Sequence, residues 1–78
     1  MAYIILNEQS ALHSKPGVIH PTVRAHLTPK NEWSVVKRPK RFTTEAEAVK
    51  YAAKNGCPIG RYEDVERNIV NVVSVMRD

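Results

Sequence analysis

Five consecutive positions in the middle of the chain hold the densest group of side chains that could bind an anion. They read Lys37-Arg38-Pro39-Lys40-Arg41, which places four cations in five positions. Lysine and arginine pair with phosphates and carboxylates, so this run favours nucleic acid, an acidic protein surface or an anionic lipid as partner. The alternative interpretation is a solvated hairpin tip that keeps a small protein soluble. No amphipathic helix accompanies the run, which argues against a membrane partner.

The basic residues are also unevenly distributed between the two halves of the chain. The 78 residues carry a formal net charge of +4. Residues 1–42 hold seven Lys and Arg against two acids, whereas residues 43–78 hold five against six. The N-terminal half is therefore the electropositive half, and we expect its basic side chains to contact the partner. The candidate partner-binding residues are Arg24, Lys30, Lys37, Arg38, Lys40 and Arg41.

Residues suited to catalysis or metal binding are few and far apart. The candidate ligands are His13, His20, His26 and Cys57. None of them stands in a CxxC, HxxxH or zinc-knuckle spacing. Cys57 follows the end of a predicted helix, where the dipole opposes a thiolate, so a small buried hydrophobe is the better interpretation. With three glycines and no glycine-rich phosphate loop, the chain predicts no enzyme activity, no metal and no cofactor.

The basic run follows segments with the pattern of β-strands. Tyr3–Leu6 is short and apolar, which predicts a buried, central strand. Residues 9–21 contain prolines and a glycine and predict a long loop. Residues 22–28 alternate apolar and polar side chains, as in a strand with one wet face that carries basic residues. A turn at Pro29–Glu32 then leads to a returning strand at Trp33–Lys37.

The second half of the chain predicts one helix, followed by a segment that fits either a strand or a second helix. Thr44 and Glu47 fit a capping box and Asn55-Gly56 a stop signal, so we expect a helix over 44–55. Five of the seven residues 69–75 are β-branched aliphatics, which favours a strand over 69–76. Helical spacing of apolar residues makes a second helix over 61–77 the alternative. Residues 61–67 fit either a helical turn or one arm of a hairpin.

These elements predict an α+β fold in a single domain over 1–78. We expect a small antiparallel sheet of three to four strands packed on one helix, with a second C-terminal helix as the alternative. The helix would pack through Ala48, Tyr51 and Ala52, with Val49 and Ala53 beside them. A core this small stabilises a chain only marginally, so a monomer or a small homodimer is expected.

The cellular location is predicted from the targeting and membrane-spanning features that the sequence lacks. It has no apolar run of 18 residues, and its first residues lack the basic and small-residue features of a signal peptide. A single cysteine leaves no internal disulfide framework. We therefore expect a cytoplasmic protein.

Two resemblances extend this interpretation. Trp33–Lys37, followed by Arg41–Ala52, resembles the strand, cap and helix of small phage and bacterial β-β-α-β proteins, one of which inhibits host RNA polymerase. Ala2–Ile5, then the capped helix with Ala48, Ala52 and Lys54 and the following Cys57 and Gly60, resembles small type I anti-CRISPR proteins. That second resemblance implies a sheet packed on one helix. It also implies binding to the backbone subunits of a CRISPR surveillance complex in the host cytoplasm.

We therefore expect a non-enzymatic phage-type inhibitor of the anti-CRISPR kind. Its basic surface would dock on a host nucleoprotein complex and block or perturb the binding of target DNA. The alternatives are direct nucleic-acid binding by an accessory or regulatory protein, and inhibition of host RNA polymerase. Trp33 and Tyr3 could stack on bases, although a lone tryptophan at a strand start more often anchors a core.

Overall fold

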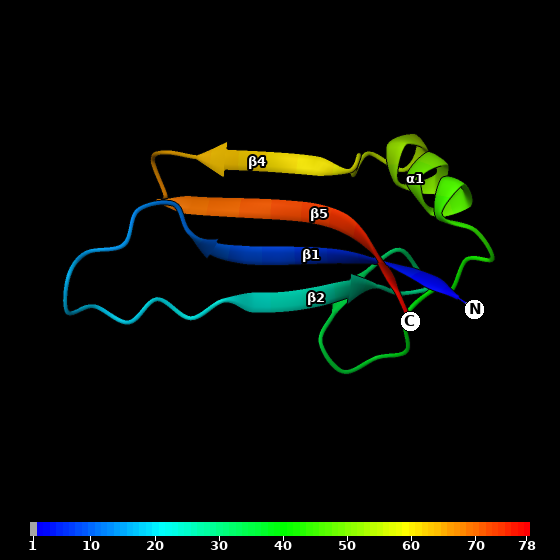
Figure 1. Ribbon diagram of the computed structural model, residues 1–78, viewed down its shortest axis with the longest axis horizontal. Coiled ribbons are helices and arrows are strands. Elements are labelled where there is room, and N and C mark those ends of the chain that lie inside the picture. Colours follow the sequence, from blue (N-terminus) through cyan, green and yellow to red (C-terminus); the bar gives the residue numbers. More distant parts are fainter. Residues whose placement is uncertain (1) are drawn as a thin grey trace.

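The structure is a computed structural model that describes residues 2–78. Its elements in chain order are β1 (Tyr3–Ala11), β2 (Val23–Leu27), β3 (Trp33–Ser34), α1 (Glu45–Lys54), β4 (Gly60–Asp64) and β5 (Ile69–Arg77). The strands form one antiparallel sheet in the order β3-β2-β1-β5-β4, and the helix lies near the end of the sheet where both termini are found (Figure 1). This confirms the α+β expectation.

The two longest strands, β1 and β5, form the centre of the sheet. They pair over nine residues each, from Tyr3 opposite Arg77 to Ala11 opposite Ile69. The predicted strand at Tyr3–Leu6 is confirmed as central, but the predicted loop over 9–21 is wrong at its start. The strand continues to Ala11 because the backbone of its polar second half still pairs with β5. The loop therefore spans residues 12–22.

The sheet has five strands, whereas three to four were expected. The additional strand is β4, one arm of a hairpin with β5, in which Glu63 pairs with Val70. Asn68 closes this hairpin with a φ of 55°, a left-handed conformation that asparagine tolerates. The alternative of a second helix over 61–77 is wrong. Because Val70, Val72 and their neighbours are β-branched, their side chains are accommodated better on a pleated strand than on a helix.

Helix α1 begins and ends where its capping residues predict. The Thr44 hydroxyl accepts a hydrogen bond from the Glu47 backbone N–H at 3.2 Å, and Asn55 is the C-terminal cap. Ala48 and Ala52 are fully buried, so their small side chains allow the helix backbone to approach the sheet closely. Val49 and Ala53, which were expected beside this apolar face, are exposed.

Removal of the N-terminal cap gives a first testable prediction. Thr44→Ala is expected to lower the free energy of unfolding by about 1 kcal/mol, because the Glu47 N–H loses its acceptor. Urea unfolding followed by circular dichroism measures the change. Thr43→Ala is the matched control, since the neighbouring Thr43 is exposed and lies outside the helix. Equal effects of the two substitutions would contradict the capping role of Thr44.

The apolar core lies between the helix and one end of the sheet. Its buried members are Ile5, Leu27, Phe42, Ala48, Ala52 and Val73. Cys57 is half-buried and packs against this cluster, close to its expected place. Helix α1 has ten residues and is not long and apolar enough to cross a membrane; residues 2–78 contain no other helix. Because the helix is short, it leaves part of the sheet face uncovered.

Candidate functional site

The tip of the β2–β3 hairpin is a tight turn that is closed by its own hydrogen bonds. The Thr28 N–H donates to the Glu32 carbonyl at 2.8 Å, and the Asn31 N–H donates to the Thr28 carbonyl at 2.9 Å. The Thr28 hydroxyl, in a residue that is 3% exposed, accepts from the Glu32 N–H at 3.1 Å. Asn31 has a φ of 60° and accepts a hydrogen bond from the Tyr51 hydroxyl. The turn is therefore tied to both strands and to the helix.

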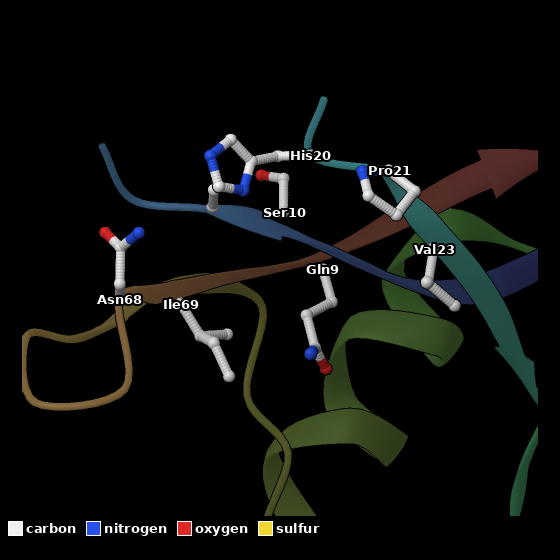
Figure 2. A pocket seen from close by; sticks show the side chains of 8 residues that line it. Gln9, Ser10, His20, Pro21, Val23, Asn68 and Ile69 are labelled. Carbon is white, nitrogen blue, oxygen red and sulfur yellow. The ribbon is translucent and has the colours of Figure 1, made fainter. Parts of the chain in front are cut away.

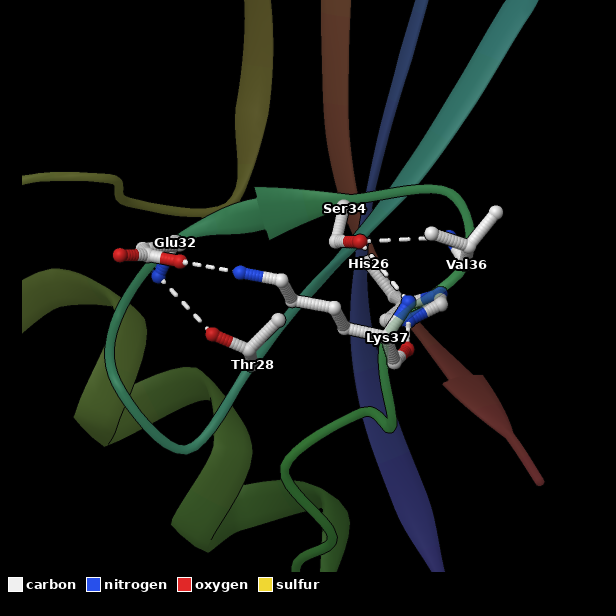
Figure 3. Close-up of polar contacts among 6 residues, drawn as sticks. All are labelled: His26, Thr28, Glu32, Ser34, Val36 and Lys37. Atoms are coloured by element: carbon white, nitrogen blue, oxygen red, sulfur yellow. Dashed lines mark hydrogen bonds and ion pairs between the residues drawn. The ribbon is translucent and has the colours of Figure 1, made fainter.

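The chain after β3 folds back toward this turn. The Ser34 hydroxyl accepts the backbone N–H groups of Val36, at 3.2 Å, and of Lys37, at 2.9 Å. His26, on β2, donates from Nε2 to the Lys37 carbonyl, as Figure 3 shows. These bonds end β3 at Ser34, so the predicted strand over Trp33–Lys37 is wrong beyond that residue. They also place Lys37 beside the turn, with its ammonium 3.3 Å from the Glu32 carboxylate.

The turn and the returning segment together enclose a shallow hollow, which we call the hairpin hollow. Its volume is about 260 Å³, and it is lined by Thr28, Pro29, Lys30, Glu32, Lys37 and Arg38. Three of the six predicted partner-binding residues therefore meet here. Lys37 is paired with Glu32, whereas Lys30 and Arg38 form no ion pair with any carboxylate in residues 2–78. The hollow thus carries excess positive charge and is suited to an anionic group.

Arg24 lies on the other face of the sheet from the helix, on the predicted wet face of β2. Its Nε atom donates to Glu8 at 3.0 Å, and the two residues face each other in the β1–β2 register. Both side chains are largely exposed, so the pair adds little stability. The pairing nevertheless lowers the attraction that Arg24 could offer to an anion, because the Glu8 carboxylate already contacts its guanidinium.

Lys40 and Arg41, at the end of the basic run, have partners of their own. The Lys40 ammonium lies 5.1 Å from the centre of the Tyr51 ring and 5.6 Å from that of Phe42, in cation–π contacts. Arg41 forms an ion pair with Asp78, the residue that follows β5. These two cations are therefore held by intramolecular contacts outside the hairpin hollow.

The residues that position the hollow differ from those that the charge pattern indicated. Glu32, Ser34 and His26 were read as turn, strand and wet-face residues, yet they hold Lys37 in place. Ser34 did carry a signal, because a serine hydroxyl can accept backbone N–H groups two or three residues later in the chain. The bond from His26 joins two segments eleven residues apart, which no local pattern shows.

The Trp33 side chain is partly exposed. It faces the helix side of the sheet, opposite Leu27 of the core, and retains 38% of its exposed area. It lines a second hollow of about 240 Å³ beyond the end of the helix. The expectation that Trp33 anchors the core is therefore wrong, because Trp33 is an exposed side chain that does not belong to the core cluster. Tyr3, the other candidate for stacking, packs against the core.

A third hollow, of about 180 Å³, lies at the far end of the sheet. Figure 2 shows the His20 ring beside Ser10, on the opposite side of β1 from the side chains of Gln9 and Ile69. The His20 Nε2 atom is buried without a hydrogen-bond partner. No carboxylate lines this hollow to orient the imidazole, so the arrangement does not form a catalytic triad. In residues 2–78 there is also no group of three His, Cys, Asp or Glu that could hold a metal ion.

Comparisons of the chain with protein families, with curated proteins and with solved structures found no match. The geometry of the hairpin hollow is therefore the observation that bears on function.

Proposed function

We propose that the protein is a non-enzymatic binding protein that docks on an anionic macromolecular partner through the hairpin hollow. The observation that carries this proposal is the placement of Lys30 and Arg38 in one hollow without a carboxylate partner in residues 2–78. The specific form we propose is the expected one, an inhibitor of the anti-CRISPR kind. The partner would be a CRISPR surveillance complex in the cytoplasm of the host cell.

Arg38 and Lys30 would have different roles in such a contact. A guanidinium can hold a carboxylate or phosphate through two parallel hydrogen bonds, whereas an ammonium acts as a compact point charge. The hydrogen bonds of the turn hold the backbone around Lys30, and the bonds of the Lys37 and Lys40 N–H groups hold the backbone on either side of Arg38. Less conformational entropy is therefore lost when the partner binds. The bound protein would then occupy positions on the complex where target DNA docks.

The distribution of charge favours a protein or nucleoprotein partner over free nucleic acid. Proteins that bind DNA through its backbone commonly make about 6–10 phosphate contacts. The hairpin hollow has three cations, one of which is already paired with Glu32. Arg24 and Arg41 are also paired, and Lys40 lies over two aromatic rings. Of the six candidate residues, Lys30 and Arg38 are the two left without an intramolecular partner in residues 2–78, and we expect two such cations to bind bare DNA or RNA only weakly at physiological salt.

Charge reversal in the hollow tests the proposal. The double variant Lys30→Glu and Arg38→Glu is expected to weaken inhibition of target-DNA binding at least about a hundredfold, since each charge-assisted bond contributes roughly 1.5–3 kcal/mol. The measurement is the inhibitor concentration needed to block DNA binding by a purified type I surveillance complex. Lys15→Glu with Lys50→Glu is the matched control, because both lysines are exposed and the net charge changes equally. Undiminished inhibition by the first variant would remove the hairpin hollow from the mechanism.

A gel shift on bare DNA and RNA across a salt series addresses the alternative of direct nucleic-acid binding. Weak binding with a shallow salt dependence is expected for the proposed inhibitor. Tight binding with a steep salt slope would instead support an accessory or regulatory nucleic-acid-binding protein. If the surveillance complex is unaffected, an in vitro transcription assay tests inhibition of RNA polymerase, which would use the same hollow.

A further inference from the structure

The helix side of the sheet contains a second candidate site, formed where the helix stops short. Helix α1 ends at Lys54, and Gly56, with a φ of 78°, turns the chain away toward β4. The uncovered face beyond this turn holds the hollow of about 240 Å³ noted for Trp33. We call it the Trp33 hollow. It is independent of the hairpin hollow, because the two have no lining residue in common.

Two aromatic side chains line the Trp33 hollow from opposite edges of the sheet. Trp33 belongs to β3 and Tyr62 to β4, the two edge strands. They keep 38% and 44% of their exposed areas, so each offers a ring surface to a ligand. The Tyr62 hydroxyl donates to the Pro58 carbonyl at 2.5 Å, which holds the Tyr62 ring in place.

The central strands contribute both apolar and polar groups to the same hollow. Val73 and Cys57 contribute apolar surface, and Asn7 and Asn71 contribute carboxamides from β1 and β5. The Asn7 Oδ1 atom is buried and has no hydrogen-bond partner. A buried acceptor without a partner is unfavourable by about 1–3 kcal/mol, so the site favours a ligand that brings a donor to these amides.

We propose that the Trp33 hollow binds the base of a nucleotide. The volume suits a single ring system, and an indole face is a favourable surface on which a base can stack. Asparagine amides pair with base edges because they present a donor and an acceptor side by side. A phenyl or indole side chain from a protein partner would leave those amides unpaired.

Trp33 is the only tryptophan of the chain, so its fluorescence reports directly on this site. Titration of the protein with adenosine, AMP and CMP is expected to give saturable quenching at about millimolar concentrations, as for one stacked ring with a few polar contacts. Ribose 5-phosphate and inorganic phosphate are expected to leave the fluorescence unchanged. If those two probes quench the fluorescence as much as AMP does, the proposal is overturned, because the quenching is then caused by the phosphate and not by stacking of a base.

Substitutions separate base binding from changes in the fold. Asn71→Val is expected to raise the dissociation constant for the nucleotide about tenfold, because a valine cannot pair with the base edge. Ser74→Val is the matched control: it puts the same side chain on the same strand, but on the opposite face of the sheet. Tyr62→Leu keeps apolar bulk and removes the ring, and is also expected to weaken binding.

Three results would count against a nucleotide site. The first is the absence of saturable quenching in the wild-type protein. The second is an equal affinity of Asn71→Val and Ser74→Val for AMP. The third is equal or tighter binding of N-acetyltryptophanamide, which would assign the Trp33 hollow to an aromatic side chain of a protein partner. None of these results bears on the charge-reversal test of the hairpin hollow.

Discussion

Ile5→Ala is expected to lower the free energy of unfolding by about 2–5 kcal/mol, the range for buried Ile-to-Ala changes that leave a cavity. Ile5 is the largest side chain that is completely buried in the protein. It lies on central strand β1 and belongs to the core cluster that joins sheet and helix. In a domain of 78 residues the total stability is only a few kcal/mol, so this loss is expected to leave much of the protein unfolded at 25 °C.

Urea unfolding followed by circular dichroism measures this effect. If Ile5→Ala shows no folded baseline, the same titration in the presence of sucrose or trimethylamine N-oxide restores one, because these osmolytes favour the compact state. Ile19→Ala is the matched control: Ile19 is 92% exposed, so the same substitution is expected to change stability by less than about 0.5 kcal/mol. A similar loss in both variants would contradict the placement of the core between helix and sheet.

Ala52→Leu is expected to lower the free energy of unfolding by about 1–3 kcal/mol or more through overpacking. Ala52 is fully buried on the sheet side of the helix, and its carbonyl also accepts the Cys57 N–H at 3.0 Å. Three additional carbon atoms cannot be accommodated there unless the helix moves away from β1 and β5. The same displacement would change the Trp33 hollow, since Cys57 lines it.

Ala53→Leu provides the control for this prediction. Ala53 is on the same helix but is exposed, and leucine and alanine have nearly equal helix propensities. The exposed substitution is therefore expected to leave the urea midpoint almost unchanged. The difference in urea midpoint between the two variants therefore separates the effect of packing from the effect of helix propensity. An unchanged midpoint for Ala52→Leu would show that the helix does not pack as closely as the buried alanines indicate.

Local patterns were sufficient for most of the elements. The Thr44 cap, the Asn55-Gly56 stop and the alternation in residues 22–28 predicted α1 and β2 to within a residue. The density of β-branched residues predicted β5 correctly against its helical periodicity. Strand β4 was harder to predict, because its polar sequence from Arg61 to Asp64 has no apolar alternation. It is a strand because β5 supplies backbone partners along its whole length.

The basic run shows most clearly what a linear pattern leaves open. Lys37, Arg38, Lys40 and Arg41 are neighbours in the chain, and their spacing alone indicated one docking surface. In the folded protein the Ser34 and His26 bonds turn Lys37 toward the hairpin hollow. Three residues later the backbone N–H of Lys40 donates to the Leu27 carbonyl at 2.8 Å, and the chain then passes on to the core. The run is therefore divided: Lys37 and Arg38 line the hairpin hollow, whereas Lys40 and Arg41 lie outside it.

The order of the amino acids by itself determined the helix with its caps, the hairpin, the last strand and the excess of positive charge in the first half of the chain. These features depend on contacts between residues close in sequence, or on composition alone. Only the tertiary structure decided which cations share a hollow, which are neutralised by Glu8, Glu32 and Asp78, and that Trp33 and Tyr62 line the same hollow. The physical reason is that these contacts are made mainly between strands distant in sequence, so they exist only once the sheet has assembled.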